Sequence, residues 1–162
     1  MKYVTTKRYG HERGYSIAYR QWRADSHCRL IHGYAIAIHL EFESDTVDVR
    51  NWVADYGSFK SFREFLNDHF DHTFLVASDD PEFATFKMLH DKGLCNMVEV
   101  EKTGCEGISE FLYNYMNDIW LPENGYRSEA HSVWCRKVTV FETPENSSSV
   151  EGSRPADRKL TE

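Results

Sequence analysis

The longest regular pattern in this chain is an alternation of apolar with polar or small side chains over residues 32–43. Because successive side chains of a β-strand point to opposite faces, this alternation predicts one long strand that is buried on one face. The expected buried face carries five large side chains, namely Tyr34, Ile36, Ile38, Leu40 and Phe42. Such a strand requires neighbouring strands for its backbone hydrogen bonds and a layer of helices to cover its apolar face.

Three other segments are candidate neighbours of this strand. Residues 2–22 are expected to hold the first strand or strands, and residues 51–56 to form the hairpin partner of the long strand. Residues 132–143 alternate again, which predicts a final strand that Pro144 ends. One face of this final strand is expected to carry Trp134, Val138, Val140 and Glu142.

Two segments repeat apolar side chains at helical spacing and predict amphipathic helices. The first begins near Ser58, the second covers residues 106–120, and a shorter helix is expected over residues 81–89. The buried stripes of the two longer helices would be Phe59, Phe62, Leu66 and Phe70 in the first and Ile108, Leu112, Tyr115 and Ile119 in the second. This order of elements predicts an α+β fold, in which a four-stranded antiparallel sheet has two helices on one face.

The length and composition fit one domain. With 162 residues, of which 41% are hydrophobic, the chain can bury a core without disulfides or a structural metal. We place this domain at residues 1–144. Residues 145–162 contain three consecutive serines and almost no apolar side chain, a composition that is typical of a disordered tail.

Composition also excludes several classes of function. A net charge of −7 argues against nonspecific nucleic-acid binding, which needs a basic face, and no apolar run approaches the roughly 20 residues of a membrane-spanning helix. The four cysteines show no C-x-x-C spacing and no leader peptide precedes them, which predicts a cytoplasmic protein with reduced thiols. Aromatic residues make up 14% of the chain, which favours an oligomer that buries the surplus flat surface.

The densest group of reactive side chains lies in residues 25–34. Cys28 stands between His27 and Arg29 and precedes His32 by four residues. A thiol acts as a base or nucleophile only as the thiolate, which neighbouring positive charge favours. The segment therefore predicts an acid/base thiol at Cys28, against the alternative that this residue is a small, buried packing residue.

Two further sites carry titratable side chains at the ends of predicted elements. Asp71 and His72 follow the first helix, where a carboxylate can orient an imidazole for proton transfer. Glu142 ends the last strand, and its carboxylate can accept two parallel hydrogen bonds from a ring amide and its amino group. The alternatives are a helix-end cap with a surface histidine for the first pair, and a solvated strand end for Glu142.

In combination and in this order, these motifs resemble the 6-pyruvoyl-tetrahydropterin synthase / 6-carboxytetrahydropterin synthase family. The resemblance covers residues 15–143 and rests on four short motifs, which are Cys28 four residues before His32-Gly33, Val53-Ala54-Asp55-Tyr56, Phe70-Asp71-His72 followed by Leu75, and Val140-Phe141-Glu142-Thr143. It implies the T-fold, in which the sheets of several subunits join edge to edge into a barrel and the active sites lie between subunits. By analogy with the family, a homohexamer of two stacked trimers is expected.

The resemblance also implies a lyase that acts on a pterin, 7,8-dihydroneopterin triphosphate. Its catalytic residues would be Cys28, Asp71 and His72, and its substrate-binding residues would be Glu142 and Glu106. The product would be 6-carboxytetrahydropterin, on the pathway to 7-deazaguanines such as queuosine, or 6-pyruvoyltetrahydropterin. The first product is favoured because it belongs to the more widespread branch of the family.

Two departures from the family pattern bear on this interpretation. The family binds zinc through three histidines, whereas here His32 matches and Tyr19 and Tyr34 occupy the other two positions, so that His27 would have to supply part of a rebuilt zinc site. Where the family reads Pro-Thr-x-Glu-Asn, residues 103–107 read Thr-Gly-Cys-Glu-Gly. The alternative to an enzyme is therefore a metal-poor T-fold protein that binds a pterin or purine or acts as a scaffold.

Overall fold

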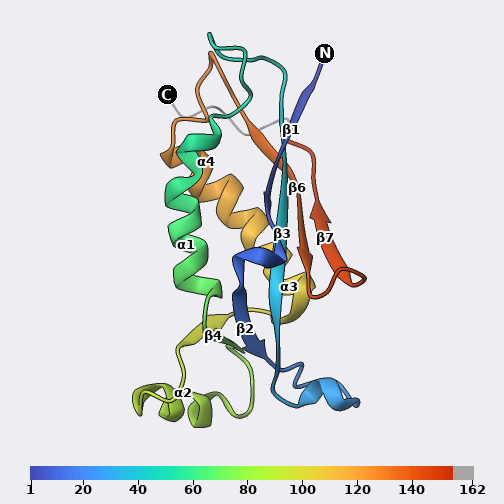
Figure 1. Cartoon of the computed structure of the whole chain (residues 1–162), viewed down its shortest axis with the longest axis vertical. Coiled ribbons are helices and arrows are strands. Elements are labelled where there is room, and N and C mark those ends of the chain that lie inside the picture. Colours follow the sequence, from blue (N-terminus) through green and yellow to red (C-terminus); the bar gives the residue numbers. More distant parts are fainter. Residues whose placement is uncertain (155–162) are drawn as a thin grey trace.

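The computed structural model describes residues 1–154, in which seven strands form a single sheet (Figure 1). The long strand predicted from the alternation is present as β3 (His32–Ser44), the spine of the sheet. Two strands pair antiparallel with β3. β1 (Tyr3–Tyr9) pairs with the second half of β3, and β2 (Tyr15–Tyr19) pairs with the first half of β3.

The rest of the sheet is mixed. In order across the sheet, the strands run β5, β4, β2, β3, β6 and β7, and β1 also pairs with β3. β6 (Trp134–Phe141) and β7 (Ser147–Glu151) are antiparallel to their neighbours, whereas β4 (Thr73–Ala77) and β5 (Met97–Val100) are parallel to theirs. The α+β architecture is as predicted, but the expected four-stranded antiparallel sheet is corrected to seven strands, in which β4 is parallel to both β2 and β5.

Residues 51–56, predicted as the hairpin partner of β3, form no strand. The carboxylate of Asp48 accepts the backbone N–H groups of Arg50 at 2.8 Å and Trp52 at 3.0 Å, which turns the chain into a loop. The helix that follows connects this loop to β4, which therefore pairs parallel to β2.

The segment predicted as a disordered tail begins with a strand. β7 pairs with β6 from Phe141 back to Lys137, and the indole N–H of Trp134 donates to the carbonyl of Gly152 at 3.1 Å. Backbone pairing stabilises this serine-rich strand, which composition alone cannot predict. The expected disorder is therefore wrong for β7, and the remainder of the predicted tail, residues 155–162, lies outside the described residues.

Helices cover both faces of the sheet. α1 (Lys60–Phe70) and α3 (Gly104–Tyr115) pack on one face over the main core, as predicted. α2 (Phe83–Asp91), which corresponds to the predicted short helix, lies on the opposite face, where a smaller cluster contains Phe74, Val76 and Phe86. No helix in the described part of the chain is long and apolar enough to cross a membrane.

A π-helical turn, Met116–Trp120, follows α3 and leads into a final short helix, α4 (Leu121–Glu123). Within this turn, the buried Asn117 binds both backbone groups of Cys135, since its amide nitrogen donates to the carbonyl at 2.8 Å and its oxygen accepts the N–H at 3.0 Å. The turn therefore fastens the helix to the start of β6. Short 3₁₀ turns at His11–Arg13, His27–Arg29 and Tyr56–Phe59 complete the described elements.

Candidate active site

Three ring side chains converge where β2 ends and β3 begins. Tyr19 pairs with His32 across the two strands, and Tyr34 lies two residues further along β3, on the same face as His32. The ring centre of Tyr19 lies 5.0 Å from that of His32 and 6.2 Å from that of Tyr34, and the latter two are 5.6 Å apart. The three positions that the family resemblance relates to zinc ligands are thus neighbours in space.

Tyr19 connects this cluster to the end of β6. Its hydroxyl donates a short hydrogen bond to Oε1 of Glu142. Tyr19 is 1% exposed, and burial, reinforced by the bond to Glu142 and the charge of its carboxylate, raises the pKa of its phenol far above the ordinary value. Burial and the charge of Glu142 also raise the pKa of Tyr34. Both phenols are therefore neutral at physiological pH, and Glu142 is held by a fixed donor.

The start of α3 lies beside Glu142. Cys105 is 6% exposed, and burial together with the carboxylates of Glu142 and Glu106 raises the pKa of its thiol to about 12. Glu106 is exposed in the first turn of α3, where a negative side chain is favourable. The structure thus brings both predicted substrate-binding residues within electrostatic reach of one buried thiol.

The end of β2 is fastened to the start of α3. The hydroxyl of Thr103 donates to the carbonyl of Arg20 at 2.9 Å, and the side-chain amide of Gln21 donates to the carbonyl of Thr103 at 3.2 Å. Gly104 has a φ of 84°, and a Cβ atom there would lie 2.2 Å from the amide nitrogen of Gln21. The left-handed φ favours glycine at this position, and a larger residue would also require the Gln21 side chain to move.

Cys28 lies in the loop that joins β2 to β3. The hydroxyl of Ser26 accepts the N–H of Cys28 at 3.3 Å, and the N–H of Gln21 donates to the carbonyl of Cys28 at 2.9 Å, which folds the loop back onto the end of β2. The side chain is half-buried, and it is close enough to Tyr34 for its charge to contribute to the raised pKa of that phenol. The structure therefore places Cys28 at the rim of the ring cluster.

Asp71 and His72 form a pair at the junction of α1 and β4. Nδ1 of His72 lies 2.7 Å from Oδ1 of Asp71, so the carboxylate accepts the Nδ1 proton and Nε2 points elsewhere. His72 has a φ of 55°, a left-handed conformation that is uncommon for a residue with a side chain, and its side chain is 86% exposed. Unusual backbone of this kind is enriched at functional sites, which supports a role for the exposed ring.

Within one chain, this pair does not join the Cys28 rim. His72 lines a shallow hollow of about 600 Å³ on the face of the sheet that carries α2, and Tyr34, Cys95 and the small residues Ser16, Ala18 and Gly33 also border this hollow. The Tyr19 ring is buried in the main core, and Tyr34 packs against that core. Among residues 1–154, no hydrogen bond or ion pair connects Asp71 or His72 with Cys28.

The donor set of the ring cluster does not fit the zinc site of the family. A neutral imidazole is a good zinc ligand, but only His32 supplies one, and the hydroxyl of Tyr19 is committed to Glu142. The raised pKa values of Tyr19 and Tyr34 keep both phenols protonated. His27 is exposed, and in the described part of the chain no three His, Cys, Asp or Glu side chains gather as metal ligands would.

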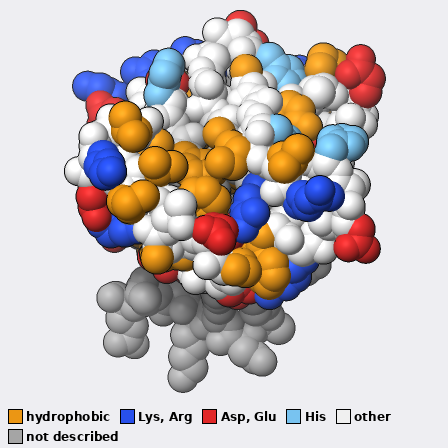
Figure 2. Space-filling view, turned by 90° about the horizontal axis from the view of Figure 1, so that it is seen from below, with side chains coloured by type: hydrophobic (Ala, Val, Ile, Leu, Met, Phe, Trp, Pro, Cys, Tyr) orange, Lys and Arg blue, Asp and Glu red, His pale blue; other side chains and the backbone are white. Residues whose placement is uncertain are grey.

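The end of the molecule that carries the Cys28 loop and α2 is rich in exposed hydrophobic side chains, which Figure 2 shows gathered near the centre of the view from below. Leu30 and Ile31, which lead into β3, are 59% and 53% exposed, and Leu94, which follows α2, is 70% exposed. Apolar surface of this kind is typical of contacts between protein molecules.

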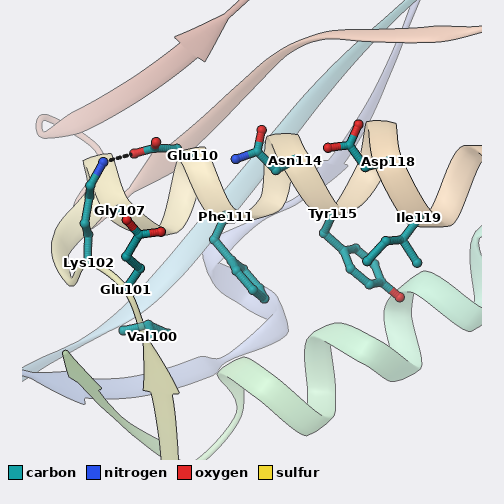
Figure 3. Close-up of a pocket in the computed structure, with 10 residues that line it drawn as sticks. All are labelled: Val100, Glu101, Lys102, Gly107, Glu110, Phe111, Asn114, Tyr115, Asp118 and Ile119. Atoms are coloured by element: carbon teal, nitrogen blue, oxygen red, sulfur yellow. Dashed lines mark hydrogen bonds and ion pairs between the residues drawn. The ribbon is translucent and has the colours of Figure 1, made fainter. Parts of the chain in front are cut away.

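A separate hollow of about 250 Å³ lies between α3 and the end of β5 (Figure 3). Phe111, Tyr115 and Ile119 form its apolar side, and an ion pair of 2.7 Å between Lys102 and Glu110 stands at its edge. This hollow contains none of the residues that the sequence singles out for chemistry, so it is distinct from the candidate site.

Comparison with known structures defines the class of fold. An uncharacterized protein of Wolinella succinogenes has a TM-score of 0.76 and 20% sequence identity, with 94% of this chain and 99% of that one covered. The 6-pyruvoyl tetrahydropterin synthase of Plasmodium vivax has a TM-score of 0.61 and 15% identity, with 95% and 99% covered. These likenesses confirm the T-fold.

The family follows from the sequence comparisons. The model of the family described as 6-pyruvoyl tetrahydropterin synthase matches residues 10–153, and the chain therefore belongs to this family. The 6-carboxy-5,6,7,8-tetrahydropterin synthase of Aquifex aeolicus (strain VF5) is 27% identical over 118 residues, which are 72% of this chain and 70% of that protein. The family inferred from the motifs is thereby confirmed.

Proposed function

We propose that this chain is a lyase of the pterin synthase type that acts on 7,8-dihydroneopterin triphosphate. Membership of the family supports a pterin-type substrate. We favour 6-carboxytetrahydropterin as the product over 6-pyruvoyltetrahydropterin, since the Aquifex aeolicus relative bears the former name.

The observation that carries the proposal is the placement of Glu142. Its carboxylate is held by the buried hydroxyl of Tyr19, next to the start of α3 and near the rim that carries Cys28. A carboxylate fixed in this way retains Oε2 and a lone pair on Oε1, which can accept the amide and amino N–H groups along one edge of a pterin ring. In the proposed complex, the side chain of the substrate extends from this ring toward Cys28.

Cys28 is the proposed base. Its thiolate would remove a proton from a side-chain carbon of the substrate, and the Asp71–His72 pair would move the second proton through Nε2 of the imidazole. Because the hollow that His72 lines does not include Cys28, and the Tyr19 ring is buried in the main core, a complete site would need His72 from a second copy of the chain.

An oligomer also accounts for two surface features. The exposed apolar end of the molecule (Figure 2) needs cover, and β5 ends the sheet with an edge that another strand can meet. We propose the homohexamer that the family resemblance implies.

The experiment is turnover of 7,8-dihydroneopterin triphosphate by the purified chain, with the products separated by chromatography. Cys28→Ala and His72→Ala are each expected to abolish turnover, whereas Cys95→Ala, which removes a half-buried thiol outside the ring cluster, should retain it. If the wild-type chain binds pterins but turns none over, the proposed lyase is refuted and the scaffold or binding protein becomes the better account.

Mixed oligomers test the shared site. When Cys28→Ala and His72→Ala chains are co-expressed, random assembly gives about a quarter of the sites an intact Cys28 and an intact His72 from two different chains. Activity should return to about that fraction of the wild-type value. Mixed oligomers that stay as inactive as either parent would contradict a site built from two chains.

A further inference from the structure

The hydrogen bonds of the ring cluster show what it offers in place of a metal. Nδ1 of His32 lies 2.7 Å from the carbonyl oxygen of Leu30. Since a carbonyl oxygen only accepts, Nδ1 carries a proton, and Nε2 is the ring nitrogen that can accept a hydrogen bond from a ligand. His32 is thus held in one tautomer, with its lone pair on the side of the ring away from Leu30.

The two phenols have different roles. Tyr19 donates its only O–H to Glu142, so this hydroxyl is occupied and fixes the carboxylate. Tyr34 is half-buried, and no hydrogen bond among residues 1–154 engages its hydroxyl. Its neutral O–H group is therefore available as a hydrogen-bond donor. The ring centre of Tyr34 lies 5.6 Å from the ring centre of His32, which supplies the acceptor.

We propose that Tyr34 and His32 form a metal-free binding site for a hydroxyl group of a small ligand, and that Tyr19 is a positioning residue that fixes Glu142 for the ring of the same ligand. The inference rests on the proposed function, because it assigns the hydroxylated side chain of a reduced pterin to Tyr34 and His32. A hydroxyl group both donates and accepts a hydrogen bond, which matches one phenol donor and one bare imidazole acceptor.

The same argument explains why zinc does not suit these residues. Three bare imidazoles would supply three good zinc ligands, whereas this cluster supplies one imidazole and two neutral phenols, which are poor zinc ligands, and one of these phenols is bound to Glu142. Replacement of two ligands by tyrosine therefore converts a site for a cation into a site for a polar, uncharged group.

The first test is metal content. The wild-type chain is produced in medium with added zinc, purified without chelators, dialysed, and analysed for metal. We expect far less than one zinc per chain, with no change in His32→Ala. About one zinc per chain that is lost in His32→Ala would overturn the proposal.

A variant designed to gain zinc binding tests whether the side chains at positions 19, 32 and 34 can contact the same bound ligand. The double variant Tyr19→His with Tyr34→His should bind about one zinc per chain, because it restores three imidazoles at these positions. The matched control, Tyr19→Phe with Tyr34→Phe, should bind none. Circular dichroism establishes that both variants fold. A folded double-histidine variant that binds no zinc would refute the inference that these three side chains point at one ligand. Should that variant not fold, the wild-type metal content still decides.

The second test is ligand preference. Titrations compare 7,8-dihydroneopterin, which has a hydroxylated side chain, with 7,8-dihydropterin, which has none. We expect the wild type to prefer the first, and Tyr34→Phe to reduce that preference about fivefold, as the loss of one hydrogen bond implies, whether or not a chelator is present. A preference that survives in Tyr34→Phe, or that a chelator abolishes, would contradict the proposal.

The two sets of results separate the two proposals. If neither pterin binds, the proposed function fails, and the metal measurements still judge whether the cluster is metal-free. If both pterins bind and zinc is present at one per chain through His32, the proposed function stands and this inference fails.

Discussion

Brief alkylation of the native protein should modify Cys28 before the other three cysteines. Only the thiolate reacts with iodoacetamide, so the rate depends on ionisation and on access. An unperturbed thiol, with a pKa near 8.5, is about a quarter ionised at pH 8. Cys105, whose raised pKa is about 12, has only about one thiolate in 10⁴ at that pH. Its rate should therefore be about 10³-fold below that of an ordinary thiol before access is considered.

The other two thiols complete the ranking. Cys135 is fully buried, and burial raises the pKa of its thiol as well, so it should react only after unfolding. Cys95 is half-buried like Cys28 but packs against the small cluster under α2, which makes it the matched comparison. We expect Cys28 to react faster than Cys95, and a bound dihydropterin to protect Cys28.

Peptide mapping by mass spectrometry after short exposures measures all four rates in one sample. If Cys28 reacts no faster than Cys95, or if a bound pterin leaves its rate unchanged, the proposed acid/base site is wrong. If Cys105 reacts as fast as Cys28 in the folded protein, the electrostatic argument itself fails, because the two carboxylates and the burial that raise the pKa of Cys105 would not have their expected effect.

Two further predictions concern stability. Arg20 binds the buried carboxylate of Asp80 through two hydrogen bonds of 2.8 and 2.6 Å, so Asp80→Asn should lower the free energy of unfolding by about 3 kcal/mol in urea titrations. Because Arg20 lowers the pKa of Asp80, this contribution is complete above about pH 4 and is lost as the pH falls through the lower folded-state value, so the variant should show a shallower acid dependence. Deletion of residues 147–162 removes β7 and the bond from Trp134 to Gly152, and the melting temperature should fall clearly. An unchanged melting temperature would show that β7 adds nothing to the stability of the sheet.

The sequence predicted β3, in which one face is buried, and missed β4, in which both faces are buried. β3 alternates and was found, whereas the five residues of β4 are all buried because α1 and α2 cover its two faces. A fully buried strand has no period of two to detect. Residues 51–56 were mistaken for a strand because backbone bonds to the Asp48 carboxylate leave no trace in an apolar pattern.

The second long helix shows a different limit of prediction from a sequence pattern. Ile119 was predicted in its buried stripe and is 43% exposed, while Met116 and Trp120 are buried. The π-helical turn, which includes Ile119, has more residues per turn than an α-helix, so its side chains are rotated away from the stripe extrapolated at 3.6 residues per turn.

The candidate site was predictable only in part. The spacing of Cys28, His32 and Tyr34 located the loop and the start of β3, and these residues do lie together with Tyr19. The bond from Tyr19 to Glu142 joins residues that are 123 positions apart, and nothing local in the sequence announces it. Tertiary proximity of this kind follows from strand order, which the sequence pattern did not provide.

The bond between Asn117 and Cys135 has a consequence for how the protein avoids aggregation. The ladder between β7 and β6 ends at Lys137, and the N–H of Gly152 donates to the carbonyl of Arg136 at 2.9 Å, so Cys135 is the first residue of β6 beyond these backbone bonds. Backbone groups left open at such a point could recruit a strand from another molecule. The side-chain amide of Asn117 carries the same donor and acceptor as a peptide group and occupies both groups of Cys135. A side chain from the helical segment thus satisfies the backbone groups of one residue of the sheet that an incoming strand would otherwise bind.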